Sequence, residues 1–357
     1  MQEIEDIEEE DNMEDMEEEE EEELFHFIAP RARMAFSKHG TLRELLFKGQ
    51  ASRLVDLFAV PVQPLYSPPS TPQAQQKKTG ILFNLPPEIH SLIFDHIEFI
   101  DDVVCFGLTS QYFWTLARGH LDDYYKSFLG TWSGENFVCV GEKVKPDDYP
   151  AGLFSAEELD TLRPLRTDVC HGGWYWNCNE PFALSHFRSP TVSDIIDYVD
   201  FRDEALSILE LCESRAKSKD PTFAARLQQI IPEHSTYFPQ DQPWILRNLT
   251  TKEFVRSEAI AVKPEYVWGP HIHRIGFGEV LVIRTCWSGS RTAAPLDSET
   301  GSPLGVWAGH RFDITTLAKH ASETDSSGWS DVSGEVRREI TQLWFCEFFI
   351  DVYRVGI

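Results

Sequence analysis

Cysteine and histidine residues in two short stretches are the side chains of this sequence that could bind a metal ion. Cys170, His171 and Cys178 make up the first stretch, and His271 and His273 make up the second. Thiolate and imidazole groups are the usual ligands of zinc, and two histidines one residue apart in a strand point to the same face. Zinc-binding cysteines usually lie two to four residues apart, whereas seven residues separate these two. We therefore predict no metal and no cofactor, and zinc binding stays open as the alternative.

Motifs for enzymatic chemistry are missing from the sequence. No Gly-x-Ser-x-Gly turn presents a serine nucleophile. The stretch Gly276-Phe277-Gly278-Glu279 is not followed by the Gly-Lys-Ser/Thr of a phosphate-binding loop. Adjacent carboxylates are common in so acidic a chain, so none of these pairs indicates a general acid and base. The sequence therefore predicts a chain that is not an enzyme.

Five aromatic residues lie beside glycines or small polar residues, in contexts typical of loops. They are Trp174, Tyr175, Trp176, Trp268 and Trp287. Exposed aromatic side chains in loops are favoured hot spots of protein binding. They can equally cover the core of a sheet, since a tryptophan ring removes a large apolar area from water. Both interpretations stay open.

The elements that could position a binding surface are clearest between residues 82 and 121. Pro86 and Pro87 fix φ and lack N–H groups, which suits the first turn of a helix. Glu88 then adds a carboxylate where the helix dipole favours negative charge. The apolar residues that follow at helical spacing, on one stripe, are Ile89, Leu92, Ile93 and Ile97.

Two more short helices are expected after the first. Asp101 or Asp102 can cap the second helix, and Thr109 or Ser110 can cap the third. The apolar side chains of these two helices are Val103, Val104, Phe106, Tyr112, Phe113, Trp114 and Leu116. A unit of about 40 residues is too small to bury this many apolar groups alone. We therefore expect its remaining apolar surface to meet either the rest of the chain or another protein.

This arrangement resembles the F-box, a short helical docking motif. The matching residues are Leu85-Pro86-x-Glu88-Ile89, Ile93-Phe94, Asp101-Asp102, Thr109-Ser110, Phe113-Trp114 and Leu116-Ala117. The resemblance covers about 40 of the 357 residues. Gln111 stands where many F-boxes have Arg or Lys, and Gly107 lies inside the expected second helix.

The resemblance implies a substrate-receptor adaptor of an SCF-type, cullin-RING ubiquitin ligase. In that family the motif docks on the cullin-adaptor subunit, and another domain holds a protein substrate for ubiquitin-dependent degradation. The chain itself would be a non-catalytic subunit. The residues that would form or support the docking face are Leu85, Pro86, Ile89, Leu92, Ile93, Ile97, Val104, Phe113 and Trp114. The alternative is an ordinary three-helix part of a protein core.

The charge of the chain is concentrated at its beginning. The net charge is −26, and residues 1–23 hold 16 acidic residues and no Lys or Arg, so the remaining 334 residues carry only −10. Such a mildly acidic body argues against nucleic-acid binding, which needs a basic face. A run of like charges stays solvated and repels itself, so a disordered tail is expected. The tail leaves a second function open, in which the chain is an acidic nuclear protein-binding module that acts independently of a ligase.

Composition divides the chain into five parts. They are a disordered acidic tail (1–24), a basic segment with short helices (25–59), a proline-rich linker (60–80), the F-box-like helical unit (81–125) and a substrate-binding α+β domain (126–357). The basic segment has a net charge of +4 over 24–59, and the linker holds five prolines within thirteen positions, which favour polyproline II. The sequence thus predicts an α+β chain whose small three-helix unit packs on a larger domain with an antiparallel sheet.

Hydrophobic patterns after residue 126 predict both strands and helices. Strands are expected at 137–140, 244–246, 251–255, 259–262, 266–268 and 280–285. Helices are expected after Ser155, over 201–216 and after Ser333. The segments that begin at Trp132, Trp244 and Ala308 also look similar to fungal F-box-like proteins. This second resemblance implies the architecture and names no substrate.

Cysteine usage and hydropathy bear on the compartment. Seven cysteines, an odd number, are scattered without a framework spacing, which is typical of a reducing environment. The acidic N-terminus lacks the pattern of a signal peptide, and no uncharged run of 18 apolar residues occurs. We expect a cytoplasmic or nuclear protein with no membrane partner.

Overall fold

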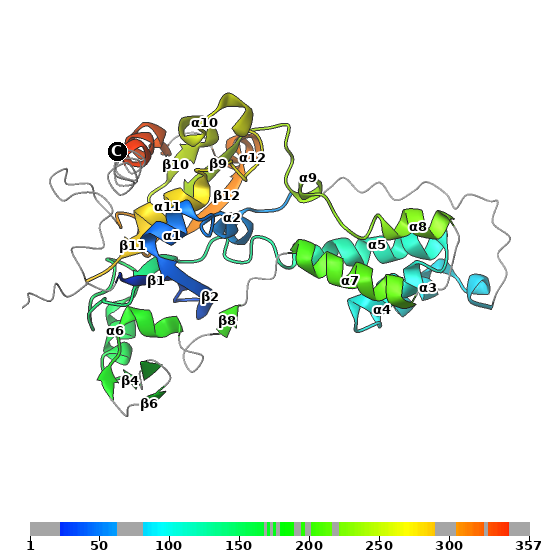
Figure 1. The fold of residues 1–357 in the computed structure, drawn as a ribbon, viewed down its shortest axis with the longest axis horizontal. Helices are drawn as coiled ribbons and strands as arrows, with labels where there is room; N and C mark the ends of the chain where they lie inside the picture. Colours follow the sequence, from blue (N-terminus) through cyan, green and yellow to red (C-terminus); the bar gives the residue numbers. More distant parts are fainter. Residues whose placement is uncertain are drawn as a thin grey trace, which may run out of the picture.

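The computed structural model describes ten stretches of the chain. They are 22–62, 81–167, 170–171, 174–175, 179–188, 194–196, 201–215, 221–289, 305–324 and 328–342. The acidic tail up to residue 21 and the proline-rich linker over 63–80 lie outside them. The described residues form an α+β fold, as predicted, in which a body with two sheets stands beside a lobe made of helices (Figure 1).

The first sheet of the body has five strands in the order β11-β3-β1-β2-β8. Their bounds are β1 Leu24–Ala29, β2 Met34–Thr41, β3 Val138–Gly141, β8 Asp194–Ile196 and β11 Cys286–Trp287. β1 pairs antiparallel with both β2 and β3, whereas the outer strands β8 and β11 pair parallel with their neighbours. The hairpin of β1 and β2 thus supplies the centre of a sheet whose other strands come from far along the chain.

The second sheet has four strands in the order β12-β9-β10-β13. Their bounds are β9 Trp244–Asn248, β10 Glu253–Arg256, β12 Phe312–Thr316 and β13 Ser330–Asp331. Every residue of β9 and β12 is buried, including Arg247 and Asp313, which pair with each other at 2.6 Å. A buried arginine needs such a partner because an unpaired charge in the core is costly.

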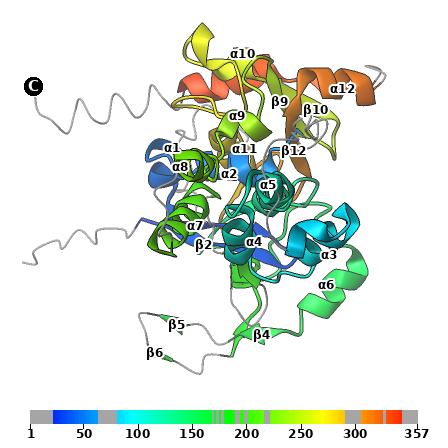
Figure 2. The ribbon, with the colours of Figure 1, turned by 90° about the vertical axis from the view of Figure 1, so that its right-hand side faces the viewer.

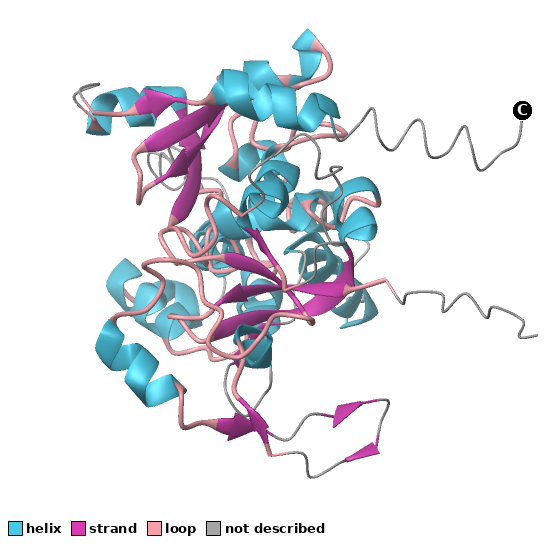
Figure 3. Cartoon of the chain, turned by 90° about the vertical axis from the view of Figure 1, so that its left-hand side faces the viewer, coloured by secondary structure: helices cyan, strands magenta, loops and turns pink. Residues whose placement is uncertain are grey.

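Three helices pack between the two sheets of the body (Figures 1 and 3). Their bounds are α1 Leu42–Phe47, α2 Ser52–Phe58 and α11 Phe277–Thr285. All nine residues of α11 are buried. Gly278 lets α11 approach α2 closely, because a Cβ at this position would lie 1.9 Å from the carbonyl oxygen of Ala51.

Five helices form the lobe that stands beside the body, which we call the helical lobe (Figures 1 and 2). Their bounds are α3 Pro87–Asp95, α4 Ile100–Gly107, α5 Gln111–Lys126, α7 Phe201–Arg215 and α8 Pro221–Leu227. The three helices predicted for the F-box-like unit are therefore confirmed. They do not stand alone, since α7 and α8 return from the later part of the chain to pack on them.

Shorter elements complete the described structure. The helices are α6 Ala156–Leu162, α9 His234–Tyr237, α10 Ser257–Ile260, α12 Leu317–Glu323, a helix over 333–342, and the 3-10 turns η1 Ile81–Asn84, η2 Leu184–Arg188 and η3 Pro264–Tyr266. The strands are β4 Arg166–Thr167, β5 Cys170–His171, β6 Trp174–Tyr175 and β7 Glu180–Pro181. The capping box predicted at Ser155 is present.

Three strand predictions were wrong. Residues 280–285 belong to the helix α11, 259–262 overlap the helix α10, and 266–268 form no strand beyond one bridge at Trp268. The hydrophobic pattern of α11 gave the wrong prediction because a helix that is buried on every side shows no helical period. A short helix of this kind has the same sequence pattern as a buried strand. The helix after Ser333 forms, but the Ser333 hydroxyl accepts from the Arg256 N–H.

The predicted division into consecutive parts also differs from the structure. The two short helices expected in 25–59 are α1 and α2, but the strands β1 and β2 precede them and were not expected. This segment belongs to the body and not to a separate part of the chain. Conversely, α7 and α8 fall inside the predicted domain 126–357 and pack in the helical lobe. These boundaries depend on packing between distant segments of the chain. Local composition contains no information on such packing.

Candidate functional site

The start of α3 is fixed by its two prolines and by one buried histidine. Pro86 occupies the N-cap and Pro87 the first helical position, where a missing N–H costs nothing. Inside the helix, His90 is almost fully buried, and its Nε2 donates to the carbonyl oxygen of Leu82 at 2.7 Å. Its Nδ1 lies 2.9 Å from the hydroxyl of Tyr112 on α5. His90 thereby ties the turn η1 to both helices, a role that the sequence analysis did not assign to it.

Close backbone approach joins α4 to α5. The hydroxyl of Ser110 accepts from the N–H of Phe113, which confirms the predicted cap of α5. Phe99, not Asp101 or Asp102, occupies the N-cap of α4, and the two aspartates lie in its first turn. Gly107 ends α4 at the point of contact, because a Cβ there would lie 2.4 Å from the Cβ of Ala117. The glycine that departs from the F-box pattern therefore has a packing role.

A stack of aromatic rings fills the space between these helices. The rings of Phe94 and Phe106 lie 4.9 Å apart, and those of Phe106 and Phe113 lie 4.7 Å apart, both stacked. Val104, Phe113 and Trp114 are buried in the same core. These three predicted site residues therefore cannot touch a partner directly, and they support the surface from beneath.

Several large apolar side chains of the helical lobe are exposed. Of the predicted site residues, Ile89 and Leu92 are 38% and 50% exposed, and Pro86 is also exposed. Leu85, Ile93 and Ile97 are half-buried. Among the described residues, ten large hydrophobic side chains are exposed, and half of them lie between 81 and 99. We call these five the apolar face: Ile81, Leu82, Ile89, Leu92 and Phe99.

Three members of the apolar face were missing from the sequence-based set. Ile81 is 86% exposed and Phe99 is 65% exposed, the largest fractions among them, and Leu82 is also exposed. The signal for Ile81 and Leu82 was their position a few residues before the proline pair, in a short turn that has no buried residue. Phe99 precedes α4 and lies outside the helical stripe, so periodicity could not find it.

The opposite side of the helical lobe is closed by the chain itself. Arg215 at the end of α7 pairs with Asp101 and Asp102 at 3.4 and 3.2 Å. The Tyr124 hydroxyl donates to Glu204 at 2.7 Å, and burial, followed by this contact, raises the pKa of Tyr124. Since α7 and α8 cover α4 and α5 from this side, only the side with α3 and η1 presents the apolar face.

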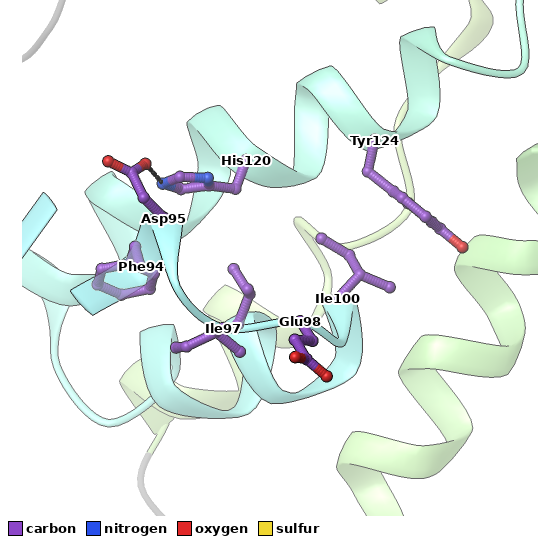
Figure 4. Close-up of a pocket in the computed structure, with 8 residues that line it drawn as sticks. Phe94, Asp95, Ile97, Glu98, Ile100, His120 and Tyr124 are labelled. Atoms are coloured by element: carbon purple, nitrogen blue, oxygen red, sulfur yellow. Dashed lines mark ion pairs between the residues drawn. The ribbon is translucent and has the colours of Figure 1, made fainter. Parts of the chain in front are cut away.

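A cavity of about 300 Å³ opens beside the apolar face (Figure 4). It lies among the end of α3, the loop to α4 and the middle of α5. The lining residues are Phe94, Asp95, Ile97, Glu98, Ile100, Val103, His120 and Tyr124. Asp95 and His120 lie on one side of the cavity, 3.7 Å apart, and Glu98 lies on the other (Figure 4). Ile97 belongs both to this lining and to the predicted docking residues.

The predicted metal candidates do not come together in the described residues. His271 lies in a loop, not in a strand, and its Nε2 lies 2.8 Å from Oδ1 of Asp56. The ring of His273 lies 5.1 Å from that of Tyr266. The side chains of Cys170 and His171 and the whole of Cys178 lie outside the described residues. Within the described part of the chain, no group of three or more His, Cys, Asp or Glu side chains could hold a metal ion.

The loop aromatics divide between the two interpretations. Trp268 is 46% exposed, as a binding hot spot requires. Trp287 is half-buried, and its indole N–H donates to the carbonyl oxygen of Asp148. The side chains of Trp174 and Tyr175 and the whole of Trp176 lie outside the described residues.

None of the described helices combines the length and apolar character needed to cross a bilayer. Neither a family model, nor a curated protein, nor a solved structure matches this chain.

Proposed function

We propose that this chain is the substrate-receptor adaptor of an SCF-type ubiquitin ligase. The helices α3 to α5 would dock on the cullin-adaptor subunit through the apolar face, and the two-sheet body would present a protein substrate. The proposal rests on the resemblance of residues 85–117 to the F-box and on the exposed side chains of the same segment.

The observation that carries the proposal is the apolar face itself. Large exposed hydrophobic side chains gather on α3, on the turn η1 before it and at the entry to α4. Large exposed hydrophobic side chains concentrated in one segment of a monomer are typical of a protein-docking site, because their burial removes apolar area from water. The buried stack of Phe94, Phe106 and Phe113 holds this surface in one shape. A rigid face loses little conformational entropy when it binds.

The proposed role requires no catalytic group from this chain. A receptor raises the effective concentration of its substrate beside the activated ubiquitin conjugate, and proximity alone accelerates transfer. The position of the helical lobe beside the body suits this role, because the docking helices and the body then face different partners (Figure 1). Trp268, exposed on the body, is the residue that we assign first to the substrate-binding surface.

The experiment is co-expression of the full chain with the cullin-adaptor subunit, followed by affinity purification and size-exclusion chromatography. We expect a stoichiometric complex, with an interface on the order of 1,600 Å². A chain that elutes free of the adaptor at micromolar concentrations would refute the proposal.

A deletion of residues 1–23 distinguishes the alternative, an acidic protein-binding module. The ligase proposal predicts that the deletion leaves adaptor binding unchanged, since the apolar face lies outside the tail. The alternative predicts that binding of the main partner is lost, and that this binding falls steeply with salt before the deletion.

A further inference from the structure

We propose that the cavity beside the apolar face receives a lysine or arginine side chain of the protein that docks there. This inference rests on the proposed docking face, not on the identity of the cullin adaptor. It assigns to the cavity a cationic side chain with an aliphatic stem as its ligand.

Apolar side chains form part of the lining of the cavity. Phe94 and Val103 are almost fully buried, and Ile97 and Ile100 are half-buried beside them. The hydroxyl of Tyr124 is already engaged by Glu204, so the remainder of its side chain is what the cavity meets. These groups can cover the methylene stem of a long side chain, which lysine and arginine often bury while their charged ends stay at a polar rim.

The rim of the cavity is acidic. Glu98 is exposed and forms no hydrogen bond or ion pair with any described residue. Asp95 lies across the cavity, with its side chain 55% exposed, and its partner among the described residues is His120, 3.7 Å away. The two carboxylates lie on opposite sides and point away from each other (Figure 4), so a cation at this rim would gain charge-assisted hydrogen bonds from one of them, Glu98, and such bonds are stronger than neutral ones.

The basic group beside this rim is a histidine, since His120 lies 3.7 Å from Asp95. Residues 81–117 contain no Lys or Arg at all, while they contain Glu88, Asp95, Glu98, Asp101 and Asp102. The two aspartates of α4 pair with Arg215, and Asp95 lies 3.7 Å from His120, so Glu98 is the carboxylate of the rim that remains for a partner. Charge complementarity therefore favours a basic group over an acidic or neutral one at this position.

The cavity is continuous with the docking face through the end of α3. Phe94, Asp95 and Ile97 of the lining directly follow Leu92 and Ile93, and Phe99 of the apolar face lies between Glu98 and Ile100. In the proposed interface, a partner that covers Leu92 and Phe99 also covers the mouth of the cavity. It would meet the acidic rim as one polar anchor within a largely apolar interface.

The test uses two small probes with the same carbon chain, n-butylammonium and n-butanol, added to the full chain. Methyl NMR signals of Ile97 and Ile100 report on the inner surface of the cavity. We expect saturable shifts with n-butylammonium, with a dissociation constant on the order of millimolar, and weaker shifts without saturation for n-butanol. Equal responses to both probes, or no saturable shift with the cation, would overturn the inference.

Matched variants complete the test. The double variant Asp95→Asn with Glu98→Gln should weaken n-butylammonium binding about tenfold, as expected for the loss of charge-assisted contacts. The control Glu210→Gln with Glu213→Gln removes the same charge from exposed positions of α7 and should leave binding unchanged. If the cavity variant binds the cation as the wild type does, the inference is wrong.

The two proposals fail separately. If the cullin adaptor is not captured, the proposed function fails, but the titration with n-butylammonium still measures whether the cavity binds a cation. If the adaptor is captured equally well by the wild type and by Asp95→Asn with Glu98→Gln, the docking face stands and the cavity has no part in docking.

Discussion

The indole N–H of Trp114 donates to Oε1 of Gln229 across 2.8 Å. Trp114 lies on α5 in the segment that resembles the F-box, whereas Gln229 follows α8, more than one hundred residues later. Arg226 adds a second tie, since its Nη2 donates to the carbonyl oxygen of Leu108 at 2.9 Å. The helices α3 to α5 are therefore held to a distant part of the chain by side-chain hydrogen bonds.

Replacement of Gln229 by alanine should destabilise the chain by about 1–3 kcal/mol, because it leaves the buried indole N–H of Trp114 without an acceptor. The neighbouring Gln228→Ala is the control, since Gln228 is exposed as Gln229 is, while Gln229 is the residue that accepts from Trp114, and the effect of the control should stay within about 0.5 kcal/mol. Urea unfolding followed by tryptophan fluorescence measures both. If the two variants unfold alike, the hydrogen bond contributes nothing.

Two glycines of the helical lobe should respond to alanine with opposite signs. Gly107→Ala places a Cβ 2.4 Å from that of Ala117, which must push α4 from α5 and should cost about 1–3 kcal/mol. Gly119→Ala, within α5, meets nothing within 4 Å and should stabilise the helix by about 0.5–1 kcal/mol. Thermal unfolding of both variants checks the prediction, and stabilisation by Gly107→Ala would contradict the close approach of the two helices.

A similar pair tests the packing of the body. Gly278→Ala drives a methyl group into the backbone of Ala51, which cannot yield as a flexible side chain would, so the loss should be at least about 2 kcal/mol. Gly334→Ala has open space around it and should be close to neutral. Chemical denaturation of both proteins measures the difference. Equal stability of the two variants would show that α11 does not cross α2 as described.

Glu279, within the buried helix α11, predicts a pH dependence. Burial raises its pKa from 4.5 to about 7, and the N–H of Gly276, which donates to it, offsets only part of this shift. The folded chain thus holds a proton that the unfolded chain releases between these pH values, so the stability from this group falls as pH rises through that window. At pH 8 the penalty should be on the order of 3 kcal/mol relative to pH 4.5.

The variant Glu279→Gln isolates this effect from the other titrating groups. Its free energy of unfolding, taken relative to the wild type, should improve between pH 5 and pH 8, because glutamine carries no charge to bury. Urea titrations at the two pH values provide the comparison. A difference between the two proteins that does not change with pH would show that Glu279 is not protonated near neutral pH.

Local signals in the sequence were enough to predict the helices that form the site. The prolines before α3 and the Ser110 cap of α5 predicted where those helices begin, because these effects act within one turn. The stripe of Ile89, Leu92 and Ile93 also indicated which side of α3 is apolar. Only the structure separated its exposed members from its half-buried ones, because exposure depends on what the rest of the chain covers.

The features that could not be predicted from the sequence depend on contacts between residues far apart in the chain. The hairpin of β1 and β2 was not predicted, because the segment was assigned from its basic charge. Phe25 and Phe27 of β1 are buried at the centre of the first sheet. The role of Trp114 as an anchor to Gln229 depends on a contact between residues 115 apart in sequence. Neither periodicity nor capping carries information over such a separation.

We propose that the apolar face binds another protein. The most direct measurement is the dissociation constant of the cullin adaptor for the wild type, for Ile89→Asp with Leu92→Asp, and for Val262→Asp, an equally exposed control on the body. All three proteins should melt alike, because exposed substitutions cost little stability. We predict that the double variant weakens binding at least about 100-fold and that the control binds as the wild type does. Wild-type affinity in the double variant would contradict the account.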